Sequence, residues 1–406
     1  MILSHKIALD TNKTQEDFFS RACGCNRFAY NWCLAKMNEM YKAWKGDNTL
    51  KKPTIALLKK EFNKIKEIEF PWVYDSPKDA NQQAFATLKR AFSNFYKGLS
   101  KYPQFKKKNK SRDSFYVSND RFLIDEYTIT LPLIGKIKMT EKLRFTGKIM
   151  SATVSRQADR WSVAINVDVL DYKKENQQKN GIIGIDLGLT TFSTGSNGME
   201  VKHPKPLKKY QKKMKRLQRQ HSRKQNGSKN KEKSRRRIAR LHKKIHDIRN
   251  DFSHKLSTQI CDETQVIVLE DLKVSNMMKN HCLAKAISDV SWAEFLRQME
   301  YKSKIFNNLI IFADTFYPST KLCSQCGHIH KDITLADRIF NCPACGFSIP
   351  RDQQAANNLH TLGLRGIYAC GHEDLCSLDK TEDTSSVVEA RSKKSKNVEY
   401  TFLHNL

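Results

Sequence analysis

Two pairs of cysteines constrain this 406-residue chain more than any other feature of its sequence. Cys323 and Cys326 form a first C-x2-C pair, and Cys342 and Cys345 form a second pair after a spacer of fifteen residues. Two such pairs place four thiolates around one Zn²⁺ in a tetrahedral site that protein ligands fill completely, so the zinc would be structural and not catalytic. Two disulfides are the alternative, which a reducing compartment disfavours. The spacing predicts a zinc ribbon over residues 321–347.

Three acidic residues bracket the cysteine motif. Asp186 and Glu270 each end a short apolar run that is typical of a buried strand, and Asp352 opens a helix-like stretch after the second cysteine pair. Open α/β sheets place their sites at such strand ends, although a lone acid there is more often a turn former. Carboxylates that converge from separate segments hold Mg²⁺ for phosphodiester hydrolysis. The three acids are therefore candidate catalytic and Mg²⁺-binding residues.

The charge of the chain indicates the substrate class. Lys and Arg number 72 against 42 Asp and Glu, which gives a formal net charge of +30. An excess of this size repels itself unless a polyanion neutralises it, and each lysine or arginine that meets a phosphate releases counterions. A solvated basic surface is the alternative, but the charge is spread through segments that have the apolar pattern of folded protein. We therefore expect nucleic acid as the phosphodiester and as a binding partner.

A strongly basic segment lies between the first two acids. Residues 203–250 contain 20 Lys and Arg but only two acids. Apolar residues recur within it at spacings of three and four, which predicts an antiparallel helical hairpin over 203–256 with an apolar seam and a basic exterior. A disordered basic linker is the alternative. The expected seam residues are Leu207, Tyr210, Met214, Leu217, Ile238, Leu241, Ile245, Ile248 and Phe252. The basic exterior includes the candidate nucleic-acid contacts Lys212, Lys213, Arg219 and Arg236.

The remaining patterns divide the chain into an α/β multidomain protein. Strand-like runs with period two predict a small β-barrel, helical spacing predicts a helical insertion in that barrel, and strands separated by helices predict an α/β layer. The expected segments are the barrel at 1–12 and 104–175, the helical domain at 13–103, the α/β domain at 180–320 and 348–366, and a mobile tail at 371–406.

The sequence also bears on the compartment. The chain has no apolar stretch of the ~18–20 residues that a membrane span needs, and its first residues lack the apolar segment of a signal peptide. We therefore expect a cytoplasmic protein that has no membrane partner and keeps its eleven cysteines reduced.

Four segments resemble one family closely, namely Gly184–Gly188, Leu269–Leu272, Ile287–Phe295 and Pro318–Cys323. They are similar to the corresponding segments of TnpB, the RNA-guided endonuclease of insertion sequences, which is related to the compact type V CRISPR effectors. The resemblance implies a RuvC-like nuclease domain of RNase H fold with an inserted zinc ribbon. It also implies an amino-terminal wedge barrel with an inserted helical recognition domain. The implied partners are a guide RNA made from the transposon end and double-stranded target DNA beside a short adjacent motif.

The resemblance assigns roles to individual residues. Asp186, Glu270 and Asp352 match the catalytic acids of the family, whose third motif reads D-R-D-x-N-A-A-x-N. Two positions depart from that motif, because Pro350 replaces its first acid and Gln354 replaces its first asparagine. A further match to positions that face the target-adjacent motif covers Lys78, Gln82 and Ser118.

The mechanism implied by the resemblance is two-metal hydrolysis. Asp186 would bridge two Mg²⁺ ions that Glu270 and Asp352 also hold, while Arg338 or a hairpin lysine would steady the developing phosphate charge. Base pairing with the guide would supply sequence specificity. Two other functions stay open. One is a DNA strand transferase, since RNase H folds with three carboxylates also carry out transposition. The other is a nuclease-inactive RNA-guided repressor, which is expected to have lost an acid.

Overall fold

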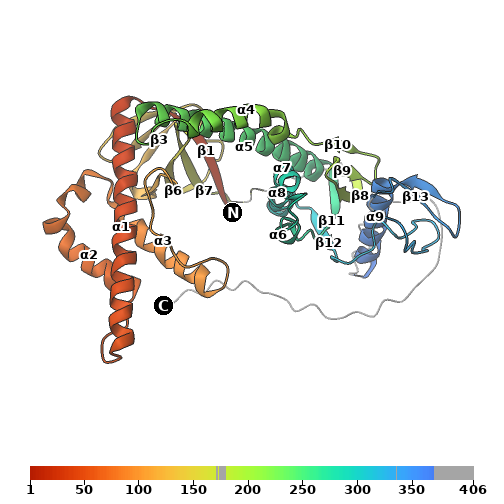
Figure 1. Cartoon of the computed structure of the whole chain (residues 1–406), viewed down its shortest axis with the longest axis horizontal. Helices are drawn as coiled ribbons and strands as arrows, with labels where there is room; N and C mark the ends of the chain where they lie inside the picture. The colour runs from red at the N-terminus through yellow and green to blue at the C-terminus, as the bar shows by residue number, and fades with distance from the viewer. Residues whose placement is uncertain (171, 173–179, 335, 370–406) are drawn as a thin grey trace.

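The computed structural model describes residues 1–170, 172, 180–334 and 336–369 of the chain. The segment expected to form a mobile tail, residues 371–406, lies outside the described residues. Two lobes, each built on one β-sheet, lie toward opposite ends of the long axis, and a pair of helices runs between them (Figure 1).

The amino-terminal lobe contains a seven-stranded antiparallel sheet. Its strands are β1 (Ile2–Asp10), β2 (Ser114–Ser118), β3 (Leu123–Asp125), β4 (Thr128–Leu131), β5 (Gly135–Met139), β6 (Lys148–Gln157) and β7 (Arg160–Asp168). They are ordered β2-β6-β7-β1-β5-β4-β3. β1 pairs along most of its length with β7 and through its last two residues with β5, so the first strand of the chain joins the two halves of the sheet. The prediction that this strand joins the later strands is confirmed.

A group of helices lies between β1 and β2 in the chain. They are α1 (Lys13–Gly46), α2 (Ile55–Glu69), the 3₁₀ helix η1 (Pro71–Asp75) and α3 (Lys78–Tyr96). α1 begins at a capping box, in which the Asn12 side chain accepts from the Gln15 N–H at 2.9 Å and the Gln15 side chain accepts from the Asn12 N–H at 3.1 Å. The helices pack around the buried ring of Phe62, whose centroid lies 5.0 Å from that of Trp32 and 5.4 Å from that of Phe85. The helical insertion therefore has an aromatic core of its own.

The carboxyl-terminal lobe contains a five-stranded mixed sheet. Its strands are β8 (Asn180–Leu187), β9 (Thr191–Gly195), β10 (Glu200–Lys202), β11 (Thr264–Glu270) and β12 (Leu309–Ala313). They are ordered β10-β9-β8-β11-β12, with β8, β11 and β12 parallel and with β9 and β10 antiparallel to their neighbours. The two buried strands predicted before Asp186 and Glu270 are β8 and β11 of this sheet.

Helices cover both faces of this sheet. The helices of the lobe are α4 (Pro206–Ser222), α5 (Lys229–Glu263), α6 (Val274–Met277), α7 (Ala284–Val290), α8 (Trp292–Phe306) and α9 (Arg351–Ala369). Ile183 and Ile185 of β8 pack with residues of α5 and α8, whereas Ile182 packs with Leu359 of α9. Because side chains alternate along a strand, Asp186 shares the α9 face of the sheet with Ile182.

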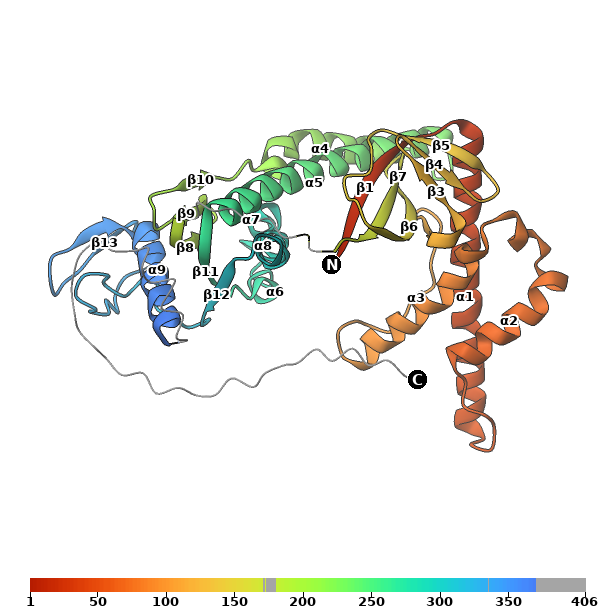
Figure 2. The same ribbon diagram turned by 180° about the vertical axis from the view of Figure 1, so that it is seen from behind.

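The predicted basic hairpin is formed by α4 and α5, which run side by side between the two lobes (Figures 1 and 2). Its seam is made by Met214, Leu217, Leu241 and Ile245, with Leu207, Tyr210 and Ile238 packed against them. The seam is shorter than expected. The second helix is longer than expected, because α5 continues to Glu263 and its last turns pack against β8. Phe252, which the helical spacing assigned to the seam, packs instead on Phe192 of β9 with a centroid distance of 4.9 Å.

The cysteine segment forms a small unit between β12 and α9. It contains the two-stranded ribbon of β13 (Ile339–Asn341) and β14 (Ser348–Pro350), and the last residue of β14 directly precedes α9. Over the part of the chain that the structure describes, no helix is both long enough and apolar enough to span a bilayer.

Candidate active site and metal centre

The register of the central sheet brings two of the candidate acids to neighbouring positions. Ile185 of β8 pairs with Leu269 of β11, so the residues that follow them, Asp186 and Glu270, lie beside each other where the two parallel strands end. Glu270 also pairs with Ala313, the last residue of β12. Side chains in register on parallel strands share a face, so both carboxyl groups lie on the side of the sheet that α9 covers.

Two glycines allow α9 to lie close against that face. A Cβ at Gly184 of β8 would come within 2.2 Å of the Ala356 carbonyl oxygen, and one at Gly363 of α9 would come within 2.5 Å of a β11 side chain. Asp352 lies one turn before Ala356, and Asp186 lies two residues after Gly184. Residues four apart in a helix and two apart in a strand share a face, so the third acid approaches the first two.

The electrostatics of Asp186 indicate that the three acids interact. Burial raises the pKa of Asp186 to about 8, and the negative charges of Glu270 and Asp352 contribute to that rise, while Arg351 opposes it. Asp186 is buried, with only 9% of its surface exposed to solvent. A divalent cation near a buried carboxylate would favour its charged form and so oppose this rise. Carboxylate oxygens are the kind of donor that Mg²⁺ prefers, but within the described residues the four cysteines are the group whose ligand atoms lie close enough together to hold an ion.

Glu270 is held by a residue that sequence reasoning did not single out. The Ser319 hydroxyl donates to Glu270 Oε1 at 2.6 Å, and Ser319 is buried. The Ser319 carbonyl oxygen accepts from Asn358 Nδ2 at 2.6 Å, and the Tyr317 hydroxyl donates to the Asn358 carbonyl oxygen at 3.1 Å. One loop therefore connects the second acid with the helix that carries the third. Both residues lie in stretches that resemble the family, Ser319 in Pro318–Cys323 and Asn358 at the end of the third motif, but the resemblance assigned neither of them a role.

The four predicted zinc cysteines lie together. Their sulfur atoms all lie within 4.8 Å of one another, with Sγ–Sγ distances of 3.7 Å between Cys323 and Cys345 and 3.6 Å between Cys326 and Cys342. Tetrahedral coordination with Zn–S bonds of ~2.3 Å needs sulfurs ~3.8 Å apart, so the cluster can hold a zinc ion. All four are free thiols, which contradicts the disulfide alternative.

The two cysteine loops have the same backbone geometry. The Gly327 N–H donates to the Cys323 carbonyl oxygen, and the Gly346 N–H donates to the Cys342 carbonyl oxygen, both at 3.0 Å. Each glycine has a φ of +74°, a left-handed conformation that an L side chain would strain. The glycine after each cysteine pair therefore allows the tight turn that brings the two thiols of the pair together.

The two departures from the family motif lie where the unit formed by the cysteine segment meets α9. Gln354 is fully buried; its Nε2 donates to the Leu322 carbonyl oxygen at 2.6 Å and its Oε1 accepts from the Ser324 hydroxyl at 3.0 Å. The longer side chain of Gln354 thus holds the first cysteine loop against the helix of Asp352. Pro350 ends β14, where it pairs with Ile339.

Cations near the acids differ from those expected. Arg338 is exposed, and its carbonyl oxygen accepts from the Arg351 N–H at 2.9 Å. Arg351 is the cation that lowers the pKa of Asp186, and its Nη1 donates to the Thr334 carbonyl oxygen at 2.9 Å. Arg351 therefore joins the acid cluster to the unit formed by the cysteine segment, a role that its place in the sequence did not reveal.

Another acid in a family-like segment is structural. Asp289, in the Ile287–Phe295 segment, is buried and accepts from the Leu207 N–H at 3.1 Å and from Arg249 Nη2 at 2.8 Å. A carboxylate at this place satisfies free N–H groups at the start of α4 and favours its dipole. Asp289 fixes the basic hairpin to the sheet.

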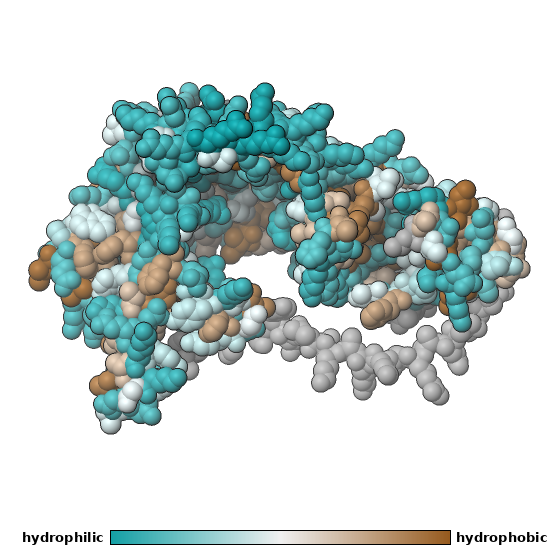
Figure 3. Space-filling view, viewed as in Figure 1, coloured by the Kyte–Doolittle hydropathy of each residue, from teal (hydrophilic) through white to brown (hydrophobic). Residues whose placement is uncertain are grey.

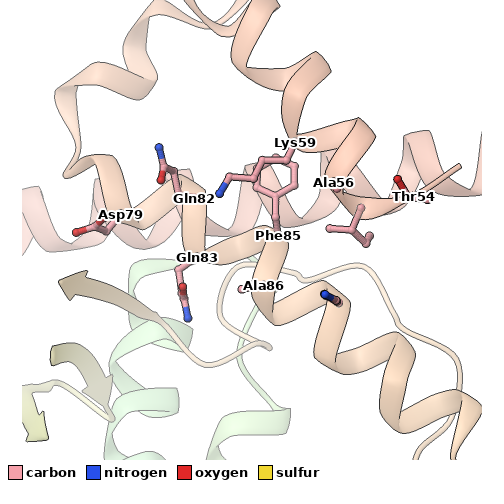
Figure 4. A pocket seen from close by; sticks show the side chains of 10 residues that line it. Thr54, Ala56, Lys59, Asp79, Gln82, Gln83, Phe85 and Ala86 are labelled. Atoms are coloured by element: carbon pink, nitrogen blue, oxygen red, sulfur yellow. The ribbon is translucent and has the colours of Figure 1, made fainter. Parts of the chain in front are cut away.

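The residues expected to face a target-adjacent motif surround the first turns of α3. The Asp79 carboxylate accepts from the backbone N–H and the hydroxyl of Ser118 at 2.9 and 2.8 Å, so the end of β2 is fastened to α3. Gln82 lines a cleft of about 430 Å³ between α2 and α3, together with Lys59 and Asp79 (Figure 4). Lys78 lines a separate cleft of about 450 Å³. The three predicted residues thus lie near one another but do not share one cleft.

The four basic residues selected on the hairpin differ in their surroundings. Lys212, Lys213 and Arg219 are exposed. Arg236 is also exposed but forms an ion pair with Glu232 at 3.3 Å. Hydrogen bonds from the neighbouring Arg235, with a contribution from Arg236, lower the pKa of Glu232 to about 2. Part of the positive charge at Arg236 is therefore already compensated within the helix.

We expect the triple substitution Lys212→Gln, Lys213→Gln and Arg219→Gln to weaken nucleic-acid binding alike for all sequences. Each lost phosphate contact removes about one released counterion, so the slope of log affinity against log salt should become shallower by about 2 to 3. Binding measured across a salt series checks this. Arg236→Gln is the matched control, with a smaller expected change because Arg236 is already paired. An unchanged slope in the triple variant would place these side chains away from nucleic acid.

Three family profiles match the chain. They are OrfB_IS605, described as "Probable transposase", over residues 162–281, the Cas12f1-like TNB domain over 292–359, and the HTH_OrfB_IS605 "Helix-turn-helix domain" over 1–46. In the structure residues 1–46 form the strand β1 and the single long helix α1, so this segment is not a helix-turn-helix. The first two profiles include all the candidate acids and zinc cysteines.

Relatives match nearly the whole chain. "Putative RNA-guided DNA endonuclease" of Streptomyces pristinaespiralis is 35% identical over 359 residues, which cover 87% of both chains. "Putative RNA-guided DNA endonuclease InsQ" of Escherichia coli is 31% identical over 381 residues, covering 90% of this chain and 93% of the relative. The fold resembles that of a solved Cas12f1–sgRNA–target DNA complex, with a TM-score of 0.53, 16% identity, and coverage of 86% and 83% of the two chains. The chain therefore belongs to the TnpB family of IS605-type OrfB proteins.

Proposed function

We propose that this protein is the RNA-guided DNA endonuclease of a transposable element. It cuts target DNA beside a short adjacent motif, and it hydrolyses the phosphodiester bond by a two-metal-ion mechanism. The observation that carries this proposal is the convergence of Asp186, Glu270 and Asp352 on one face of the sheet. The names of the two relatives support the substrate class and the use of a guide RNA.

The acids would act as metal ligands. Two Mg²⁺ ions, when bound, activate the attacking water and stabilise the leaving oxygen. Asp186 would hold the ions together with Glu270 and Asp352, the two carboxylates whose charges act on it. The Ser319 hydroxyl fixes one oxygen of Glu270 and leaves the other available as a ligand. The four cysteines would hold one structural zinc ion.

The strand order supports a RuvC-like domain of the RNase H class. Three parallel strands flanked by an antiparallel pair, in the order β10-β9-β8-β11-β12, carry Asp186 and Glu270 on the face that α9, the helix of Asp352, covers. We assign this domain to residues 180–320 and 348–366, with the zinc ribbon at 321–347. We interpret the seven-stranded sheet as a wedge-type barrel and α1 to α3 as the recognition domain.

The arrangement of the lobes suits a long nucleic-acid partner. Figure 3 shows the surface hollowed between the lobes, beneath a largely hydrophilic surface over α4 and α5. The hairpin segment 203–250, which has 20 basic residues and two acids, forms much of this hydrophilic surface. A guide RNA from the transposon end, paired with target DNA, would lie along this basic surface and be held by its backbone. The proposed compartment is the bacterial cytoplasm.

The two other functions are less well supported. A strand transferase would use the same metal chemistry, but the relatives that match nearly the whole chain carry endonuclease names. An inactive repressor is expected to lack an acid, whereas all three acids are present, and the charges of Glu270 and Asp352 act on Asp186. The converging acids therefore favour the endonuclease.

The test of the proposed function is to purify the protein from cells that carry its element, sequence the RNA that copurifies, and offer DNA that matches this RNA. We expect a defined RNA species and cleavage of matching DNA that requires Mg²⁺ and stops when EDTA removes it. Cleavage that persists in EDTA, or purification without any defined RNA, would refute the proposal.

A further inference from the structure

Phe316 is the most exposed of the large apolar side chains that the structure describes, with 91% of its surface open to solvent. It lies in the loop that follows β12, between Asp314 and Ser319. Water disfavours so large an apolar area, since an aromatic side chain can bury about 150–250 Å². The exposure of this ring is therefore suited to a contact with a partner.

Both ends of the loop that contains Phe316 contact Glu270. Ala313, three residues before Phe316, pairs with Glu270 in the sheet, and Ser319, three residues after it, donates a hydrogen bond to the Glu270 carboxylate. Because a residue spans at most ~3.3–3.6 Å, the backbone of Phe316 lies within about 11 Å of both anchor points. The exposed ring is thus attached at the rim of the acid cluster.

The backbone on both sides of Phe316 is fixed. The Phe316 N–H donates to the Asp314 carboxylate at 2.8 Å, and the Tyr317 N–H donates to the Asp314 carbonyl oxygen at 2.9 Å. The Tyr317 hydroxyl is bonded to the Asn358 carbonyl oxygen of α9. The exposed position of the ring is therefore imposed by hydrogen-bonded neighbours and is not that of an unanchored loop.

We propose that Phe316 is a positioning residue on which a nucleobase of the cleaved DNA strand stacks, close to the scissile phosphate. This inference rests on the proposed function, which places the cleaved strand at the acids. Every base has a π-face, so stacking on an aromatic ring holds single-stranded DNA without reading its sequence. Such a ring complements the acids, because carboxylates repel the phosphate backbone when no cation is present. The Ser319 end of the same loop orients Glu270, so one segment would position both ligand and substrate.

The test compares single-turnover cleavage of two substrates by the protein–RNA complex. One is ordinary matching DNA, and the other carries abasic nucleotides beside the cut position mapped with the wild-type protein. We expect Phe316→Ala to slow cleavage of ordinary DNA about 5- to 100-fold, and Phe316→Trp to retain it. We expect Phe316→Ala and wild type to cut the abasic substrate at similar rates, because neither can stack a base there.

The matched control is Leu123→Ala, which removes another exposed apolar side chain, 74% exposed and located in β3 of the other lobe, and should leave both rates unchanged. An unchanged rate of Phe316→Ala on ordinary DNA would overturn the inference while leaving the proposed function intact. An equal slowing on both substrates would also overturn it, since that result indicates a structural role. A wild-type protein that cuts neither substrate would overturn the proposed function itself.

Discussion

Asp186→Ala and Glu270→Ala are expected to lose DNA cleavage by about three orders of magnitude or more while RNA binding is unchanged. Removing one ligand from a two-metal site costs several kcal/mol of transition-state stabilisation, and each 1.36 kcal/mol is a factor of ten in rate. We expect RNA binding to depend instead on the basic surface of the hairpin between the lobes. A cleavage assay run beside an RNA mobility-shift assay measures both properties on the same preparations.

Two further variants sharpen this experiment. Asp186→Asn keeps the shape of the buried side chain, so its loss of activity would report on the carboxylate and not on packing. Glu200→Ala removes an exposed acid from β10 of the same sheet, and we expect it to cleave normally. Cleavage by either alanine variant at the wild-type rate would contradict the assignment of the acids.

Loss of zinc is expected to have the second-largest effect. Cys342→Ser should abolish stable zinc binding, lower solubility and reduce cleavage strongly, because a structural metal contributes directly to the folding of its unit. In the wild type, elemental analysis should give one zinc per chain. The effect reaches the acids through hydrogen bonds, since Leu322, next to Cys323, accepts from Gln354 and Asn358 of α9. Active wild-type protein with almost no zinc would contradict this site.

Ser319→Ala separates the two parts of this prediction. It removes the hydrogen bond to Glu270 without touching a cysteine, so zinc content and solubility should stay normal. Hydrogen bonds to charged groups contribute about 1.5–3 kcal/mol, which corresponds to a loss of roughly tenfold or more in cleavage rate. Excess Mg²⁺ should restore part of the rate, because the carboxylate remains present but is less well oriented. Normal cleavage at limiting Mg²⁺ would show that Ser319 does not position Glu270.

The sequence predicted the parts of the site that depend on residue type and spacing. Cysteine pairs at this separation are typical of a four-thiolate knuckle, and Asp186 and Glu270 follow apolar runs that are typical of buried strands. Gly184 was visible as part of a family segment, but its close contact with Ala356 emerged only in the folded chain. The types of residue at the site could therefore be predicted from the sequence, whereas the close packing of α9 on the sheet could not.

The features that the sequence missed depend on partners far away in the chain. Ser319 acts on a residue 49 positions earlier, and no local pattern marks a serine for that role. Phe252 continues the helical spacing of the hairpin seam, but α4 does not extend far enough along α5 to cover it. The Phe252 ring therefore packs on Phe192 of the sheet. Arg236 has the same sequence signal as Lys212, yet it pairs with Glu232. Periodicity gives the face of a helix but not the neighbour that covers it.

The most direct test of the central claim is a guide exchange. The RNA that copurifies with the protein is remade with its DNA-matching segment replaced by an unrelated sequence, and the complex is offered an equal mixture of two plasmids that each match one of the two RNAs. The protein–RNA complex should cut whichever plasmid the bound RNA matches, so cleavage should move from the first plasmid to the second when the RNA is exchanged. Cleavage that stays on the first plasmid, or that falls equally on both, would contradict RNA guidance.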